Sequence, residues 1–266
     1  MNKVKITSFT AGLVLAMAFT FSCSSDDDGG GGGGSGGGDK GNDIGNYRTV
    51  VIGTQTWMAE NLNYAVEGSK CYGEGGEVAI GEDENFSLTT LSNAEVQANC
   101  DKYGRLYDWA TAMALPPSCN ENSCHEQTQE IQEPHQGICP SGWHIPSRVD
   151  WRILGEYVDN SGAKLKATSG WVENDGTDEF GFSALPGGYA MPGGIFSVPN
   201  EVFGSVGING YWWSATEHSQ YSELARFLFI RIMPMFEDMD DPRAYDMDDP
   251  RTHKSLMQSV RCLKDN

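Results

Sequence analysis

One stretch constrains the fold of this chain more than any other, because it combines a cysteine, a turn and a helix start. It covers residues 137–154 and reads GICPSGWHIPSRVDWRIL. Ser147 suits the N-cap of a helix, and the side chain of Asp150 is placed to complete a capping box. The apolar spacing that follows predicts one buried helical face, formed by Trp151, Leu154, Tyr157 and Val158. We therefore expect Cys139 to fix the entry of this unit and the helix to place an aromatic stripe in a core.

The rest of the ordered chain reads as strands and loops built around this unit. Residues 47–52 (YRTVVI) and 55–58 predict a β-hairpin that turns at Gly53. Further strands are expected at residues 210–216, 224–232 and 257–263. The apolar run of residues 224–232 is typical of a buried strand.

Two more helices are expected between the hairpin and the central unit. The first starts at Ser92, with Glu95 as its capping partner. The second covers residues 107–114 and is ended by Pro116. The polar sequence from there to the central unit predicts a loop.

The charge of the chain excludes one class of partner. The 266 residues carry 37 Asp and Glu against 18 Lys and Arg, which gives a net charge of −19. An acidic surface repels phosphate backbones, and no cluster of Lys and Arg offsets this repulsion. We therefore expect no nucleic-acid partner, and the length suits one sizeable core.

The N-terminus predicts export and a membrane anchor. Lys3 and Lys5 precede an apolar run over residues 11–21, which is too short to span a bilayer. Residues 1–22 therefore read as a signal peptide, and Cys23 directly after it resembles the lipidation site of a bacterial lipoprotein. An acyl-glyceride on Cys23 would hold the chain at the outer membrane. The alternative is an ordinary signal peptide that leaves Cys23 as a free thiol.

Residues 23–46 are interpreted as the lipidated cysteine followed by a tether. The acidic run Asp26, Asp27 and Asp28 resembles surface-export signals of Bacteroidota lipoproteins, and it is equally interpretable as a solvated spacer. Residues 29–38 are almost entirely Gly, which predicts a flexible segment. We expect the domain of residues 47–266 to be exposed at the cell surface.

Six cysteines remain after Cys23, and an even number in an exported chain predicts disulfides. The sequence alone does not choose among the many connectivities. Our hypothesis is the set Cys71–Cys100, Cys119–Cys124 and Cys139–Cys262, of which the last would tie the central unit to the final strand. A zinc site is the alternative, although Cys119, Cys124 and His125 lack zinc-finger spacing.

A local repeat suggests a cation site. The sequence DMDDPR occurs twice, eight residues apart. Its six carboxylates could bind Ca²⁺ weakly, because Ca²⁺ prefers several oxygen ligands; they belong to Asp238, Asp240, Asp241, Asp246, Asp248 and Asp249. The alternative is a charged surface loop, and no other cofactor is expected.

Several motifs together carry a family resemblance. They are WMAENLNYA (57–65), CDKYGRLYDWATAM (100–113), GICPSGWHIPSRVDW (137–151), FSALPGGY (182–189), GYWWSAT (210–216) and SVRC (259–262). Over residues 47–264 the chain resembles the Fibrobacter succinogenes major paralogous domain, which occurs in secreted and lipid-anchored bacterial proteins. That family has no settled biochemical activity.

The central motif is also similar to the turn and helix of C-type-lectin-like and formylglycine-generating-enzyme-like domains. This resemblance implies an α+β fold with a small twisted antiparallel sheet, about two helices and extensive loops, stapled by disulfides. Fold analogy does not fix function. The formylglycine-generating chemistry needs a reactive cysteine pair in the C-terminal part, where this chain has only Cys262.

We expect no enzymatic activity. The sequence lacks G-x-S-x-G, H-E-x-x-H, P-loop and Rossmann patterns. Its five His residues are scattered, and His144 in the central turn is interpreted as a packed, hydrogen-bonded side chain. Paired carboxylates of the kind that hydrolyse glycosides remain an alternative, because sequence does not give their distances.

Export and a tether instead favour a binding role. Sugar rings stack on aromatic side chains, and the candidates are Trp171, Tyr189, Tyr211, Trp212 and Trp213. Successive strand residues point to opposite faces, so we expect one of Trp212 and Trp213 in the core and the other exposed. The first hypothesis is thus an adhesion module for a glycan or an extracellular protein. The others are an exported hydrolase-like enzyme, favoured by two carboxylates in a cleft, and a structural envelope lipoprotein without a small ligand.

Overall fold

The computed structural model describes residues 40–41, 43–80, 87–124, 134–173, 175–194, 199–231 and 251–266. The signal peptide, Cys23, the Gly-rich tether and the six repeated carboxylates from Asp238 to Asp249 lie outside these residues. None of the helices in the described part has the length and apolar character that a membrane crossing needs.

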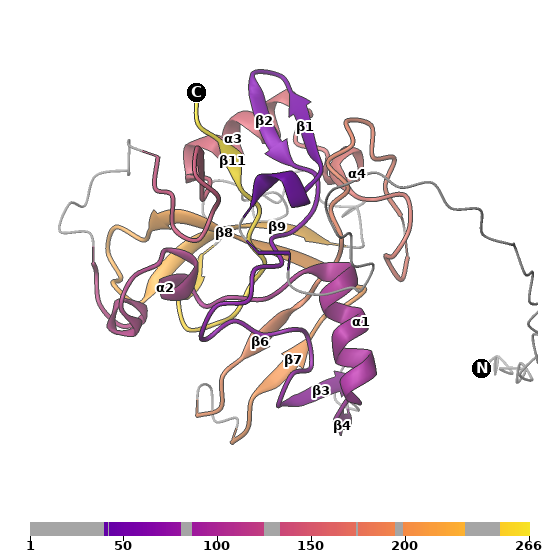
Figure 1. Ribbon diagram of the computed structural model, residues 1–266, viewed down its shortest axis with the longest axis vertical. Helices are drawn as coiled ribbons and strands as arrows, with labels where there is room; N and C mark the ends of the chain where they lie inside the picture. Colours follow the sequence, from indigo (N-terminus) through magenta and orange to yellow (C-terminus); the bar gives the residue numbers. More distant parts are fainter. Residues whose placement is uncertain are drawn as a thin grey trace, which may run out of the picture. The chain divides into compact units, whose positions relative to one another are not determined.

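The first sheet joins the two ends of the domain. Its strands, in order across the sheet, are β1 (Thr49–Ile52), β2 (Gln55–Met58), β11 (Leu263–Lys264) and β5 (Trp143–His144), and all pairs are antiparallel. β1 and β2 form the predicted hairpin, with Ile52 opposite Gln55. The last strand therefore lies between the hairpin and the central unit, and Figure 1 shows β11 beside β2.

Two further sheets complete the described strands. One has the order β10 (Arg251–His253), β9 (Leu224–Arg231) and β8 (Asn209–Glu217). The other has the order β4 (Ser87–Thr89), β3 (Glu77–Ile80), β7 (Val202–Gly204) and β6 (Tyr189–Met191), and its β3–β7 pair is parallel. The sequence predicts one small sheet, whereas the described residues form three. Most of the strands are only two to four residues long, so they do not extend into a common ladder.

The helices begin where their capping residues predict. α1 (Asn93–Tyr103) has the capping box of Ser92 and Glu95, and α3 (Arg148–Tyr157) has that of Ser147 and Asp150. α2 (Trp109–Ala112) and α4 (Gly162–Leu165) are single turns, and short 3-10 helices cover Ile44–Asn46 and Pro117–Asn120. The α+β class is confirmed, with two longer helices among the described residues.

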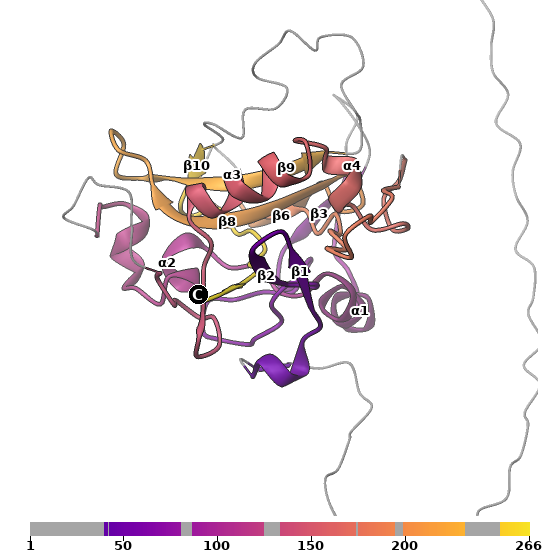
Figure 2. The same ribbon diagram turned by 90° about the horizontal axis from the view of Figure 1, so that it is seen from above.

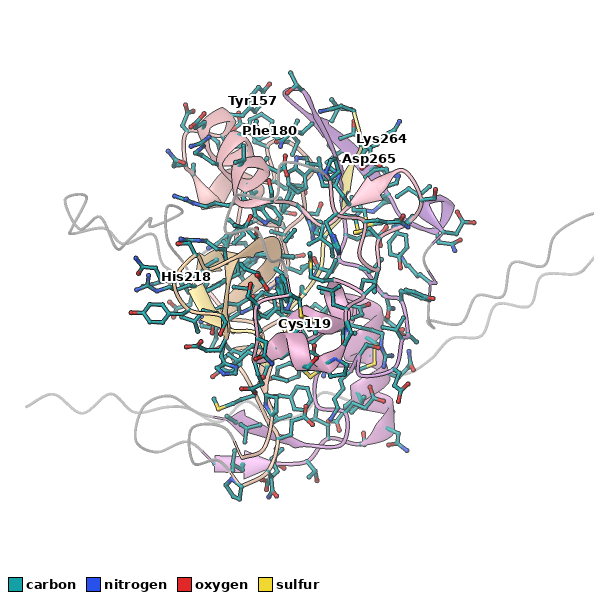
Figure 3. The ribbon with its side chains drawn as sticks, turned by 90° about the vertical axis from the view of Figure 1, so that its left-hand side faces the viewer. Cys119, Tyr157, Phe180, His218, Lys264 and Asp265 are labelled. Carbon is teal, nitrogen blue, oxygen red and sulfur yellow. A yellow bond between two sulfur atoms is a disulfide. The ribbon has the colours of Figure 1, made fainter. Side chains whose placement is uncertain are left out.

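α3 packs against β8 and β9, as Figure 2 shows from above. Trp151, Leu154 and Val158 are buried as predicted, and the ring of Trp151 stacks on Trp57 at 4.7 Å. Tyr157 is a wrong prediction, because 52% of it is exposed. It lies at the border of the buried face, where its ring contacts Phe180 edge-on at 5.6 Å (Figure 3).

Disulfides join distant parts of this core. The structure contains Cys71–Cys100, Cys119–Cys124 and Cys139–Cys262, which are the hypothesised pairs. The longest connects residues 123 positions apart, and both of its cysteines are fully buried. The zinc alternative is wrong, since Cys119 and Cys124 are bonded to each other.

The predicted strand at residues 257–263 is largely absent. Met257 bridges to Ala190, Gln258 to Tyr107 and Ser259 to Trp212. These residues are buried and extended, but each pairs with a different element, so a regular ladder starts only at Leu263.

The folded part begins before Tyr47, the predicted start of the domain. The backbone N–H of Lys40 donates to the carbonyl of Asn63 at 2.8 Å, and the hydroxyl of Tyr47 donates to the carbonyl of Gly41 at 2.7 Å. Residues 40 and 41 therefore already contact the domain, whose expected start is Tyr47.

Candidate functional site

Three of the five predicted aromatic ligand residues are in the core. Trp212 and Trp213 are both 0% exposed and Trp171 is 5% exposed, so the expectation of one exposed Trp on this strand is wrong. β8 is covered on both faces: Trp212 packs with the Trp57 and Trp151 cluster, and Trp213 packs with the cluster around α2.

The indole N–H groups of these residues have internal partners. That of Trp212 donates to Asn61 Oδ1 at 2.8 Å, that of Trp213 to the carbonyl of Tyr107 at 2.7 Å, and that of Trp171 to the carbonyl of Ala184 at 3.1 Å. These three tryptophans are therefore structural residues of the core.

The other two candidates do meet at the surface. Tyr189 and Tyr211 are half-buried, and their rings lie 5.6 Å apart in an edge-on contact. Tyr211 also stacks on Phe229 at 4.9 Å. These three rings, here called the aromatic patch, are the part of the predicted aromatic surface that the structure retains.

A cavity of about 250 Å³ lies elsewhere, where three of the resemblance motifs meet. One wall is the loop after β2, another is the C-terminal end of α1, and a third comes from the segments around residues 167–169 and 183–185. Its lining residues are Lys40, Arg48, Ala59, Glu60, Asn61, Asn63, Cys100, Asp101, Lys102, Gly104, Ala167, Ser169, Ser183 and Leu185. No local sequence pattern predicts that these walls meet, because the loop after β2 and the segment at residues 183–185 are about 120 residues apart in the chain.

The floor of the cavity is a capped helix end. The side-chain amide of Asn61 donates to the carbonyl of Tyr103 at 2.8 Å, and that of Asn63 donates to the carbonyl of Cys100 at 3.2 Å. The backbone at Gly104 has a φ of +74°, and a Cβ there would lie 2.7 Å from the carbonyl oxygen of Leu62. Glycine is therefore needed for α1 to end against the loop after β2.

A buried arginine, Arg261, lies behind the cavity walls that contain Asn61 and Ser183. Arg261 is 1% exposed, and its Nε and Nη2 donate to Asn61 Oδ1 at 3.2 and 2.7 Å. It also donates to the carbonyls of Phe182 and Ser183, and its guanidinium lies 4.2 Å from the ring centre of Phe182. Burial lowers the pKa of Arg261 to about 9. Because it bonds both Asn61 and Ser183, Arg261 fixes the separation of two lining residues.

Ser183 is held in a conformation that non-glycine residues rarely adopt. Its φ is +53°, which costs about 1–3 kcal/mol. The carboxylate of Asp178 accepts from the backbone N–H of Ser183 at 2.7 Å and from its hydroxyl at 2.7 Å. Strain of this kind is concentrated at binding sites, where surrounding contacts maintain it.

The charged groups at the cavity differ in their partners: Glu60 is paired with cations, whereas Lys102 contacts an aromatic ring. Glu60 accepts from Lys40 Nζ and from the backbone N–H of Arg48 at 2.8 Å, and its carboxylate lies 3.7 Å from Arg48 Nε. Burial alone would raise the pKa of Glu60, but these hydrogen bonds and charges lower it below its ordinary value. Lys102 lies over the ring of Tyr103, with Nζ 4.8 Å from the ring centre.

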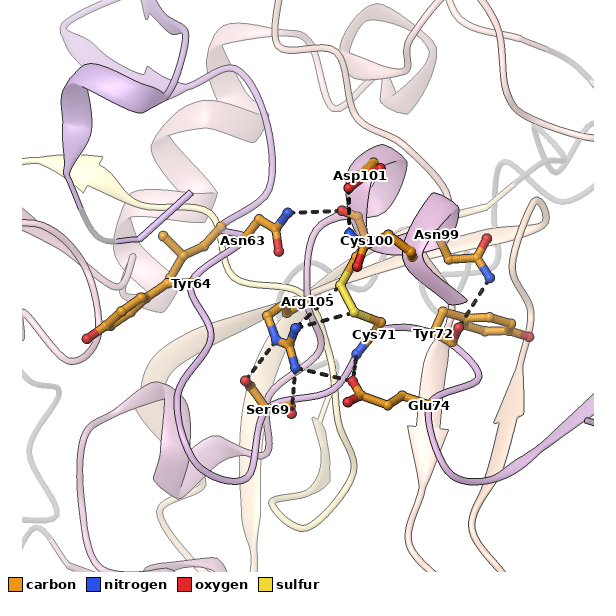
Figure 4. The surroundings of a disulfide bond; sticks show 12 residues. Asn63, Tyr64, Ser69, Cys71, Tyr72, Glu74, Asn99, Cys100, Asp101 and Arg105 are labelled. Carbon is orange, nitrogen blue, oxygen red and sulfur yellow. Dashed lines mark hydrogen bonds and ion pairs between the residues drawn. A yellow bond between two sulfur atoms is a disulfide. The ribbon is translucent and has the colours of Figure 1, made fainter. Parts of the chain in front are cut away.

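The Cys71–Cys100 disulfide anchors the C-terminal end of α1 next to the cavity. Cys100 lines the cavity, and the guanidinium of Arg105 lies 3.3 Å from Cys71 Sγ and 3.6 Å from Cys100 Sγ (Figure 4). Arg105 also pairs with Glu74 at 3.2 Å. The same view shows Asn63 bonded to the carbonyl of Cys100, so the disulfide and the floor of the cavity form one contiguous structure.

His144 lies apart from the cavity as a packed residue. It is 7% exposed, and its Nδ1 lies 2.7 Å from Asp265 Oδ1. The calcium prediction concerns residues outside the described part of the chain. Within the described residues, no group of three or more His, Cys, Asp or Glu side chains is arranged to hold a metal ion.

Comparison with known proteins gives a family but no characterised relative. The model of the Fibrobacter succinogenes major domain matches residues 50–264. No curated protein and no solved structure matches the chain, so the similarity to C-type-lectin-like domains stays a prediction. The family match covers most of the sequence and contains every lining residue of the cavity except Lys40 and Arg48, and the chain belongs to the Fibrobacter succinogenes major domain family.

Proposed function

We propose that this protein is a non-enzymatic binding module of the cell envelope that holds a glycan or a segment of an extracellular protein in the cavity. The observation that carries the proposal is the convergence of three motif segments on one cavity, with a strained Ser183 in its wall. Adhesion is the role that such a module would serve on an anchored, surface-exposed chain.

The size and chemistry of the cavity favour a small polar group. Its volume of about 250 Å³ is below the roughly 300–1,000 Å³ typical of sites for drug-sized ligands. Ser169 and Ser183 offer hydroxyl groups, and charged side chains surround them. One sugar residue of a longer chain, or one side chain of a protein, fits this combination.

Glu60 argues against a hydrolase. Two carboxylates, Glu60 and Asp101, line the cavity, which is the feature that would favour glycoside hydrolysis. A general acid in that reaction needs a raised pKa, whereas the pKa of Glu60 is lowered and its oxygens already accept two hydrogen bonds. Binding is therefore the better proposal, with hydrolysis as the second candidate.

The proposed location follows from the N-terminus. A lipid on Cys23 would anchor the chain in the outer membrane, and the Gly-rich tether would join the domain at Lys40. Lys40 itself lines the cavity. A ligand would thus bind close to the point where the tether enters the domain.

The test is a glycan and extracellular-matrix protein array probed with the chain from residue 24 onward. We expect ligands that Ser169→Trp loses, because the indole would fill the cavity from its wall. Thr168→Trp is the matched control, since Thr168 is exposed and next in the chain but does not line the cavity. Hits that survive Ser169→Trp but are lost with Tyr211→Ala would move the site to the aromatic patch.

Two additions to the array test the other hypotheses. A chelator arm tests the Asp-rich repeat, since ligands lost without calcium would implicate residues 238–249. Release of reducing ends from a bound glycan, abolished by Glu60→Gln, would replace the binding proposal by the hydrolase. An array without any ligand would leave a structural envelope lipoprotein as the remaining hypothesis.

A further inference from the structure

We infer that the ligand of the cavity is a saccharide with an anionic group, a carboxylate or a sulfate, which the cations of the cavity bind. This inference rests on the proposed function and names its ligand class. It starts from an inversion of charge: the chain as a whole has a net charge of −19, yet cations outnumber carboxylates at this place.

The count includes the groups directly behind the walls. Lys40, Arg48 and Lys102 line the cavity and Arg261 lies behind it, whereas the carboxylates are Glu60 and Asp101 in the lining and Asp178 behind Ser183. Four cations therefore face three carboxylates. One anionic group bound in the cavity would neutralise the excess positive charge.

Each of these carboxylates already accepts at least one hydrogen bond from the protein. Glu60 accepts from Lys40 and from the backbone of Arg48, Asp178 accepts twice from Ser183, and Asp101 accepts from the side-chain amide of Gln97 at 2.8 Å. The negative end of α1 is covered as well, because Asn61 and Asn63 donate to its carbonyl groups. The principal acceptors at the cavity thus have donors within the protein.

Two of the cations keep donors for a ligand. Arg48 is 67% exposed, and its contacts in the described residues use Nε and Nη2, with Nη2 3.2 Å from the carbonyl of Ala59. Its Nη1 therefore has both N–H groups available. Lys102 forms no ion pair with any described carboxylate, and its Nζ lies over the face of the Tyr103 ring.

Arg261 strengthens the attraction from below. It donates to neutral acceptors, and no described carboxylate pairs with it directly. A charge in the low-dielectric interior is weakly screened, so it acts over the short distance to a group bound between Asn61 and Ser183. The hydroxyl groups of Ser169 and Ser183 suit the neutral hydroxyl groups of the same sugar, which makes an acidic saccharide a better match than an isolated inorganic anion.

The experiment measures binding of the chain from residue 24 onward to three probes by calorimetry. The probes are trigalacturonate, its methyl ester, which is uncharged, and a sulfated galactose disaccharide, which carries a sulfate and no carboxylate. We expect the free acid or the sulfated probe to bind at least about tenfold more tightly than the ester, and the pair of acidic probes decides between carboxylate and sulfate. Raising the salt concentration should weaken binding of the acidic probe only.

Single charge removals locate the effect. Lys102→Gln and Arg48→Gln should each weaken binding of the acidic probe about tenfold and weaken binding of the ester much less, because the ester lacks the charge that these cations attract. Arg152→Gln is the control, because it removes the same charge from an exposed position on α3 outside the cavity.

The possible outcomes distinguish failure of the anionic-ligand inference from failure of the proposed binding function. Equal affinity for the acid and the ester, both lost with Ser169→Trp, would overturn the anionic ligand and leave the binding function intact. Binding of a neutral glycan or protein from the array, with none of the acidic probes, would do the same. Failure of every glycan and protein to bind would overturn both.

Discussion

Among the described residues, two cations are at most 1% exposed, and the protein compensates their charges in different ways. Lys254 is 0% exposed and pairs with Glu217, with Nζ 2.5 Å from Oε1. It also donates to the carbonyls of Cys119 and Asn122, and it lies 4.4 Å from the ring centre of Trp109. Arg261 has only neutral acceptors and aromatic rings around it among the described residues.

The difference separates a buried charge that is paired with a carboxylate from one that is paired only with neutral groups. Burial lowers the pKa of both cations, because it disfavours the charged form. At Lys254 the cost is offset by a carboxylate in direct contact, and the pair holds the Cys119–Cys124 loop to the core. At Arg261 the charge is left to act on its surroundings, and those surroundings include the wall of the cavity.

The largest expected effect comes from a disulfide. Cys139–Cys262 is next to Arg261 in the chain, and Cys119–Cys124 lies beside Lys254. Replacing Cys139 and Cys262 together by Ala should lower the free energy of unfolding by about 5 kcal/mol, since this bond closes a long loop in the unfolded chain. Replacing Cys119 and Cys124 together by Ala should cost only about 2 kcal/mol, because their loop is short. Urea unfolding measures both values. Equal losses would mean that loop closure does not set the difference between the two regions.

Removing the paired cation should come next. Lys254→Met leaves the Glu217 carboxylate without its cation, which we expect to cost about 3–5 kcal/mol in urea unfolding. Lys254→Met combined with Glu217→Gln should recover part of that loss, because no buried charge then remains. If the double variant is as unstable as the single one, the ion pair is not what stabilises this region.

Removing the other cation should cost less. Arg261→Met takes the buried charge away together with its desolvation cost and leaves only neutral acceptors, so we expect about 1–3 kcal/mol. Asn61 Oδ1 still accepts from Trp212 Nε1 at 2.8 Å in this variant. The same urea titration checks it, and a larger loss than for Lys254→Met would break the comparison.

The smallest expected effect is a pH dependence of stability that comes from His144, a third cationic group that is buried next to carboxylates. Burial would lower the pKa of His144, but Asp150 and Asp265 raise it above 6.5. The stabilisation is therefore fully present below the ordinary pKa and is lost as the pH rises through the raised pKa of the folded state. Stability measured between about pH 5 and about pH 9 should fall on the alkaline side in the parent chain.

His144→Gln is the control for this dependence. It should remove the alkaline decline. The separate acidic decline, which comes from Asp150 and lies below the pH 5 end of this range, should become smaller but persist, because Ser147 still hydrogen-bonds the carboxylate of Asp150. Burial raises the pKa of Asp150, but hydrogen bonds from His144 and Ser147 lower it below 3.8, so its contribution is lost as the pH falls through that lowered value. An unchanged alkaline decline in His144→Gln would assign the effect to another group.

Local features of the fold were predictable because neighbouring residues encode them. The capping boxes of Ser92 with Glu95 and of Ser147 with Asp150, and the turn between β1 and β2, each depend on residues only a few positions apart. The cysteine pairs were a correct hypothesis, but the bond of Cys139 to Cys262 depends on β11 returning beside β5.

Burial of the aromatic residues could not be predicted in the same way. Strand alternation correctly places Trp212 and Trp213 on opposite faces of β8, but it does not say that α3 covers one face and the cluster around α2 the other. For Tyr157 the error has the opposite sign. Its position on the helix predicted burial, but it lies at the edge of the packed face of α3 and is exposed.

The sequence by itself determined the family, the α+β class, the helix starts and the acidic character of the chain, because motifs, capping residues and composition are properties of the chain read in order. Only the tertiary structure decided where a ligand could bind. The cavity combines the loop after β2, the end of α1 and the segment at Ser183, and it inverts the sign of the overall charge. Packing between distant segments creates both features, and no local pattern records which segments will meet.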